Sequence, residues 1–206
     1  MSTSRAYHHG DLRAALLEKA RTVLAAEGVE GLSLREVARQ AGVSHAAVYN
    51  HFRDKAGLVG AVVDAAFVRL ATDLARARAS TSDPFDALQR EGVAYVRFAY
   101  RNKADFKIMF RPELCGLAAQ EQPQKKSAAY EILVETVRAC QAAGSIAPGP
   151  PEPAVLAAWS IVHGLSSLIV DGPDPALAPT LASAEKLARQ CGDVLRYGLS
   201  GQARRA

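Results

Sequence analysis

The sequence predicts an all-α protein, and three observations lead to this fold class. Alanine and leucine dominate the chain, no segment alternates apolar and polar residues as a half-buried strand would, and apolar residues recur at three- and four-residue spacing. Capping residues, glycines and prolines divide these apolar stripes into about nine helices. The 206 residues, 49% of them hydrophobic, suffice for one large or two modest domains with a proper core.

The first helix is predicted to begin at Asp11, a favourable N-cap, and to end near Gly28. Its apolar residues form one stripe at helical spacing: Leu12, Leu16, Ala20, Val23 and Leu24. Ser33 and Glu36 match a capping box, in which each side chain binds the other residue's backbone N–H. This box places the start of the second helix at Leu34.

The second and third helices are short, and residues 41–44 separate them. Gly42 suits the left-handed residue that ends a helix, and Ser44 can cap the next one. The predicted inward residues are Leu34, Val37, Ala38, Val48 and Phe52. Nucleating a new helix costs free energy, whereas extending an existing one does not. A break between two short helices therefore indicates that their fixed angle has a function. Two short helices across a tight turn can present the second one to the DNA major groove, and the alternative is a solvated helix pair within a bundle.

The outward residues of the third helix are suited to DNA. Asn50 can pair bidentately with adenine, and Ala46 or Ala47 can contact a thymine methyl group. Further donors can reach phosphates: Tyr49, His51, Lys55 and the backbone N–H groups near Ser44. From the residues alone, DNA binding is therefore the favoured interpretation of this segment.

The rest of the chain is predicted to be helical with short breaks. Asp54 caps a long fourth helix over residues 55–79, and Asp83 with Pro84 begins the fifth. The later helices are predicted over residues 85–102, 104–110, 122–143, 153–170 and 180–199.

Charge and cysteine content narrow the class of protein. The net charge of +4 allows an anionic partner without demonstrating one. Cys115, Cys140 and Cys191 are widely separated, which argues against a disulfide framework or a thiolate metal site and suits a reducing cytoplasm. We find no signal-peptide pattern and no uncharged apolar stretch of the ~18 residues that a membrane span needs. We therefore expect a cytoplasmic protein with no membrane partner.

A helical hydrolase that uses Cys115 or Cys140 with a histidine is the enzymatic alternative. Four of the five histidines lie at or before His51, and no nucleophile elbow or metal-spaced cluster is present. We therefore expect no catalytic residues, no cofactor and no metal.

Residues 7–63 closely resemble the N-terminal domain of TetR-family transcriptional regulators. The resemblance rests on the run over residues 27–35, the turn over 41–44, and residues 48–52 followed by Asp54 and Lys55. It implies a DNA-binding domain over residues 1–56, with the helix-turn-helix at 33–52, and a C-terminal effector-binding and dimerisation domain over 57–206. In the family, the positions that face bases match His45, Ala46, Tyr49 and Asn50, and those at phosphates match Ser33, Ala47, His51 and Lys55.

One short helix reads too few base pairs for useful selectivity, so we expect a homodimer on a palindromic operator. The apolar stripe of residues 180–199 can pack in a four-helix arrangement with a symmetry mate, or it can be internal core. The family dimerises through its last two long helices, which favours an interface. The candidates are Leu165, Ile169, Leu181, Ala184, Leu187, Ala188, Cys191, Val194 and Leu195.

Residues 157–172 resemble the WHG-type C-terminal domain of one branch of these regulators. Trp159 and His163 share one helix face, and His163 either contacts an effector or packs in the core. The resemblance implies an effector cavity, for which the candidates are Tyr95, Phe98, Phe106, Met109, Phe110, Tyr130, Val134, Trp159 and His163. Few of these are polar, which predicts a small, largely apolar effector. The expected function is a repressor that this effector releases from DNA, and the alternative is a constitutive DNA-binding regulator without an effector.

Overall fold

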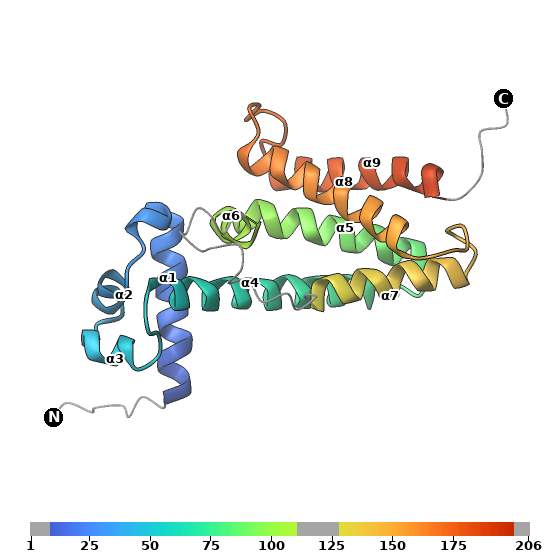
Figure 1. The fold of residues 1–206 in the computed structure, drawn as a ribbon. Coiled ribbons are helices and arrows are strands. Elements are labelled where there is room, and N and C mark those ends of the chain that lie inside the picture. The colour runs from blue at the N-terminus through green and yellow to red at the C-terminus, as the bar shows by residue number, and fades with distance from the viewer. Residues whose placement is uncertain (1–8, 111–127, 200–206) are drawn as a thin grey trace. The chain divides into compact units, whose positions relative to one another are not determined.

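The structure, a computed structural model, describes residues 9–110 and 128–199, which form nine α-helices and no strand (Figure 1). This confirms the predicted all-α fold. The contacts divide the described residues into two compact units. The N-terminal unit contains residues 9–66 and 104–110, and the C-terminal unit contains residues 67–103 and 128–199.

The N-terminal unit is built on α1 (His9–Gly31), α2 (Leu34–Ala41), α3 (His45–Tyr49) and the first turns of α4 (Lys55–Arg78). The helix α1 begins ahead of Asp11, so Asp11 lies inside the helix and is not its N-cap. Its backbone leaves helical geometry at Gly28 (φ 70°), where we predicted the end. The predicted apolar stripe is confirmed as core, because its members are buried or packed on buried neighbours: Leu12, Leu16, Ala20, Val23 and Leu24.

Local capping fixes the turn between α2 and α3. The Ser33 Oγ accepts a hydrogen bond from the Glu36 N–H (3.1 Å), as predicted. The Glu36 carboxylate binds the Arg39 and Gln40 side chains, because a charge-assisted bond to a guanidinium is stronger than one to a backbone N–H. This corrects the expectation of a reciprocal capping box. Gly42 is left-handed (φ 67°) and closes α2, as predicted.

The helix α5 (Pro84–Arg101) lies at the centre of the C-terminal unit and contacts α7 (Ala128–Ala142), α8 (Glu152–Asp171) and α9 (Leu181–Leu199), as Figure 1 shows. Asp83 caps α5 by accepting the Asp86 N–H (2.7 Å), as predicted. Residues 122–127 of the predicted seventh helix lie outside the described residues. Only its later part can therefore be compared with α7.

Two apolar clusters hold the C-terminal unit together. Phe85 and Leu88 of α5 pack with Val137 and Cys140 of α7 and with Val155 of α8. Farther along α5, Val93 and Val96 pack with side chains of α8 and α9, among them Leu165, Ala184 and Ala188. A single helix thus supplies one wall of both clusters.

One described helix, α8, is long and apolar enough by composition to cross a membrane, with a mean hydropathy of 1.7 over its best window. This corrects the expectation that no apolar stretch of the chain is long enough for a span. Its residues Ala154, Val155 and Ala158 are buried in the cluster with α5 and α7, as in the core helix of a globular unit. One helix of this length and composition is weak evidence for a membrane span.

The short helix α6 (Lys103–Phe110) contributes to the N-terminal core although it follows α5 in the chain. Ile108 is buried in the same cluster as Leu16 of α1 and Val37 of α2. Leu58 and Val59 of α4 belong to that cluster as well. The compact N-terminal unit thus includes α6 and the first turns of α4 besides α1, α2 and α3.

Candidate functional site

The helix α3 has one buried side and one exposed side. Val48 is fully buried and Phe52 is 3% exposed, and both belong to the core of the N-terminal unit. Tyr49 is 56% exposed, and the other base-facing candidates, His45, Ala46 and Asn50, are exposed too. The candidates for base contact therefore form a solvent-facing surface on a helix that is anchored from behind.

Capping and ring contacts hold α3 in place. The Ser44 Oγ accepts the Ala47 N–H (3.2 Å), which fixes the start of the helix. At its other end, the Arg13 guanidinium of α1 lies 5.4 Å from the centre of the Phe52 ring, and the His51 ring is tilted against the same ring at 6.4 Å. A helix of five residues is too short to be stable alone, so these contacts determine its orientation.

The phosphate candidates lie around the same surface in different environments. Ser44 is exposed, whereas Ser33, Ala47 and His51 are half-buried. Both serine oxygens accept backbone N–H groups, and each hydroxyl keeps its own proton for an external acceptor.

Lys55 has a role that the sequence reading missed. Its Nζ donates to the Val29 carbonyl oxygen at 2.8 Å, next to the break in α1 at Gly28. The Leu32 N–H donates to the same oxygen at 3.2 Å, so Lys55 adds a second hydrogen bond to this carbonyl and ties the start of α4 to the end of α1. An ammonium has three N–H donors, so two remain for a phosphate.

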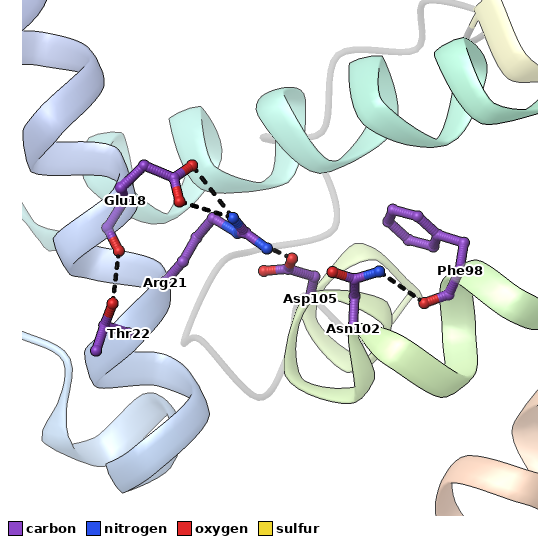
Figure 2. A network of polar contacts seen from close by, with 6 residues as sticks. All are labelled: Glu18, Arg21, Thr22, Phe98, Asn102 and Asp105. Carbon is purple, nitrogen blue, oxygen red and sulfur yellow. Dashed lines mark hydrogen bonds and ion pairs between the residues drawn. The ribbon is translucent and has the colours of Figure 1, made fainter. Parts of the chain in front are cut away.

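An ion pair that the sequence analysis did not predict joins α1 to α6 inside the N-terminal unit. Arg21 Nε donates to Asp105 Oδ2 at 3.1 Å, and Arg21 Nη1 donates to the Glu18 carboxylate at 2.8 Å (Figure 2). Asp105 is 4% exposed. The two partners are 84 residues apart, so no local spacing pattern could have predicted their contact.

The C-terminal unit contains a connected group of aromatic side chains. The Tyr95 hydroxyl lies 2.9 Å from His163 Nδ1, and the His163 ring centre lies 5.8 Å from that of Trp159. Tyr130 meets Trp159 edge to face at 6.4 Å. Four of the nine predicted effector-pocket residues are therefore brought together. We call these four the aromatic cluster.

Burial shifts the pKa values in the aromatic cluster in a consistent way. It raises the pKa of Tyr95, which a hydrogen bond from the Trp159 side chain partly opposes, and it lowers the pKa of His163. Both groups are therefore held neutral near pH 7. Tyr95 satisfies His163 Nδ1, as in a packed core histidine, and this contact is compatible with either predicted role of His163.

The other five predicted pocket residues lie elsewhere. Phe98 is buried on α5, and Val134 of α7 packs on the cluster around Val137. The remaining three, Phe106, Met109 and Phe110, lie on α6 in the N-terminal unit, and the rings of Phe106 and Phe110 are 5.1 Å apart. The nine candidates are thus divided between the two units.

A cleft of about 380 Å³ lies in the C-terminal unit and is lined by residues of α4, α5, α7 and the segment between α4 and α5. None of the nine predicted pocket residues lines it. Thr136 lines it, and the Thr136 Oγ1 donates to the Glu91 Oε1 at 2.6 Å. The sequence reading did not single out Glu91, because a lone glutamate within an amphipathic helix resembles an exposed residue.

Most of the predicted dimer stripe is used inside the subunit. Leu165, Ala184 and Ala188 are buried, and Ile169, Leu187 and Cys191 pack on them. Leu195 packs on the other cluster, and Leu181 is half-buried. Val194 alone of the nine is exposed, at 72%. The stripe packs against α5, whose apolar face runs alongside it.

The cysteines and the acidic side chains show no catalytic arrangement in the part of the chain that the structure describes. Burial raises the pKa of the Cys140 thiol to about 12, as is typical of an inert structural cysteine. Cys191 is half-buried, and Cys115 lies outside the described residues. Within residues 9–110 and 128–199, no three His, Cys, Asp or Glu side chains come together as a metal site would require.

Comparison with known proteins agrees with this architecture. The model of the family described as "Bacterial regulatory proteins, tetR family" matches residues 16–62, and that described as "Tetracyclin repressor-like, C-terminal domain" matches residues 88–191. A protein of unknown function from Rhodococcus sp. RHA1 is 33% identical over 96% of this chain and 100% of that chain, with a TM-score of 0.78.

Two further solved structures show the same fold. The TetR family transcriptional regulator PfmR from Thermus thermophilus is 24% identical over 92% of this chain and 99% of that chain, with a TM-score of 0.63. A bacterial regulatory protein in the tetR family from Rhodococcus RHA1 is 20% identical over 91% and 96%, with a TM-score of 0.66. With α3 exposed on one side in its N-terminal unit and both family models matched, this chain belongs to the TetR family of DNA-binding transcriptional regulators.

Proposed function

We propose that the protein is a cytoplasmic, homodimeric repressor that binds a palindromic operator and leaves it when a small, largely apolar effector binds. The exposed side of α3 is the observation that carries this proposal. Tyr49 and Asn50 are exposed, while Val48 between the capping serine and Asn50 is fully buried. A helix anchored in this way can enter the major groove without unfolding its own support.

Base and phosphate contacts would divide among neighbouring residues of this surface. His45, Ala46, Tyr49 and Asn50 would meet base edges, where an asparagine can pair bidentately with adenine. Ser33, Ser44, Ala47, His51 and Lys55 would lie at phosphates. The two N–H groups that Lys55 does not use on Val29 are available for this contact.

The exposed apolar side chains of α8 and α9 would pack against a second copy of the chain. Leu156 and Leu168 of α8 are 59% and 52% exposed, and Val194 and Tyr197 of α9 are 72% and 78% exposed. A twofold axis through these helices would bury all four side chains in the dimer. Of the four, Val194 is also one of the dimer-interface candidates predicted from the sequence. The palindromic operator follows from the same twofold symmetry.

The aromatic cluster is the effector site that we propose within the C-terminal unit. Tyr95 and His163 would supply the polar contacts, and Trp159 and Tyr130 the apolar ones. Effector binding would move the end of α5 near Asn102 and, through α4, the spacing of the two reading helices. A ligand can do this only by its difference in affinity between the two states.

Operator selection from random duplex DNA, followed by gel shift with and without candidate effectors, tests the proposal. We expect one palindromic sequence to be enriched, a complex of two chains per duplex, and release by a compound whose effect is lost in His163→Ala. If no duplex is bound under any condition, the proposed function is wrong. A complex that no compound affects would instead support the constitutive regulator.

A further inference from the structure

The cleft in the C-terminal unit has an apolar part in its wall and can be reached from solvent. Ala75 of α4, Ala79 just after α4, and Ile132 and Ala139 of α7 line it, and Ala75 and Ala79 are exposed. Its volume of about 380 Å³ lies in the range of small-molecule sites. Because the walls are short side chains, the space suits a slender apolar body.

A buried carboxyl group is hydrogen-bonded to a residue of the cleft wall. Glu91 is 3% exposed and stands one helical turn after Ala87, which lines the cleft. Thr136 also lines the cleft and donates to the Glu91 Oε1 at 2.6 Å. The second carboxylate oxygen, Oε2, is buried and has no hydrogen-bond partner among the described residues. A buried acceptor in this position costs free energy until a donor reaches it.

The charges around the cleft favour a cation. Arg78 lines the cleft, but its Nη1 is paired with the Glu135 Oε2 at 2.6 Å. Asp83 lines it as well, and its carboxylate caps α5. Glu135 thus neutralises Arg78, and the carboxyl groups of Asp83 and Glu91 remain at or next to the cleft without an ion pair among the described residues, so a positively charged ligand would restore the balance.

We infer that this cleft binds a small organic amine, whose ammonium group donates to the Glu91 Oε2 and whose apolar body lies between α4 and α7. Desolvation raises the pKa of Glu91 to about 7, so the empty site holds a proton at lower pH that a bound ammonium would displace. None of the four residues of the aromatic cluster lines this cleft.

Calorimetric titration of the full chain at pH 8 with hexylamine, 1-hexanol and hexanoate tests this inference. These probes share one apolar chain and differ in the head group. We expect hexylamine to bind roughly tenfold or more tightly than 1-hexanol, and hexanoate to bind most weakly. Equal affinity for the amine and the alcohol, or no binding of any probe, would overturn the inference.

Three variants connect the binding to this cleft. Glu91→Gln keeps the shape of the side chain and should lower hexylamine affinity roughly tenfold while leaving 1-hexanol unchanged. Ala75→Leu adds a side chain at an exposed position of the wall and should weaken both probes. Glu185→Gln, which removes a carboxylate paired with Arg97 away from the cleft, is the matched control and should change neither.

Full hexylamine affinity in Glu91→Gln would exclude Glu91 as the recognition group, and full affinity in Ala75→Leu would exclude the cleft. Circular dichroism verifies that each variant is folded. No DNA is present in these titrations, so a negative result would not contradict operator binding. A negative gel shift, in turn, would not contradict the amine site.

Discussion

The Arg21 guanidinium of α1 donates to the Asp105 carboxylate of α6 at 3.1 Å, and Asp105 is almost fully buried (Figure 2). The same guanidinium also pairs with the exposed Glu18, one turn away on α1. One arginine thus has a buried long-range partner and an exposed local partner. The two pairs allow a direct comparison of what each contributes.

Asp105→Ala should lower the free energy of unfolding by about 1–3 kcal/mol, because it removes a buried acceptor for a charged donor. Glu18→Ala is the matched control and should cost less than about 0.5 kcal/mol, since an exposed pair is screened by water. Urea denaturation of both variants measures the difference. Equal losses would show that Asp105 does not fasten α6.

Tyr49→Ala should cost roughly 1–3 kcal/mol of operator affinity and leave the melting temperature unchanged, because the side chain is exposed. Val48→Ala, at the adjacent buried position, should lower the melting temperature. Gel shift measures the operator affinity of the two variants, and thermal melting measures their stability. Together they distinguish a side chain that contacts DNA from one that packs in the core. A Tyr49→Ala protein that no longer melts cooperatively would place this side chain in the core.

Gly42→Ala should destabilise the protein by about 1–2 kcal/mol, because a φ of 67° is unfavourable for a residue with a Cβ. A Cβ at this position would meet no atom within 4 Å, so backbone strain is the whole effect.

Gly60→Ala is the control for Gly42→Ala. A Cβ there also meets nothing within 4 Å, and the residue lies within α4 at ordinary helical geometry. This change should stabilise the helix by up to about 1 kcal/mol. Opposite signs in denaturant unfolding are the expected result, and a stabilised Gly42→Ala would contradict the left-handed turn.

Glu91 should make the protein less stable as pH rises. Desolvation raises its pKa from 4.5 to about 7 in the folded state, so between these values the native protein binds more protons than the unfolded chain. Stability from the neutral carboxyl is therefore present below pH 4.5 and lost as pH rises through 7. The loss is about 3 kcal/mol, from a pKa difference of about 2.5 units between 4.5 and 7.

Glu91→Gln should remove this dependence. The variant is expected to be more stable than the natural protein at pH 8 and equal to it at pH 4.5, by urea unfolding. Thr136→Val removes the hydroxyl that donates to Glu91 and should have the opposite effect at pH 8. His163 is common to all three proteins, so its own titration cancels in the comparison. Parallel pH profiles for the natural protein and Glu91→Gln would refute the assignment.

Features that depend on nearby residues were predictable from the sequence. Ser33, Ser44 and Asp83 cap their helices as predicted, and Gly42 closes α2, because each of these bonds spans at most four residues. The exposed side of α3 followed from the helical period, which places Val48 and Phe52 on the opposite face. The sequence by itself therefore determined most of the helices, several of their caps and the exposed side of α3, whereas the start of α1 ahead of Asp11 was not predicted.

Tertiary packing decided the contacts that local spacing cannot encode. Only the folded chain brings Asp105 to Arg21 and Lys55 to the Val29 carbonyl. The stripe with Leu165 and Ala184 had two possible uses in the sequence, and in the folded chain these two side chains pack against α5. An apolar stripe specifies that it must be buried but not against which surface, and a buried ion pair depends on helices meeting across many residues.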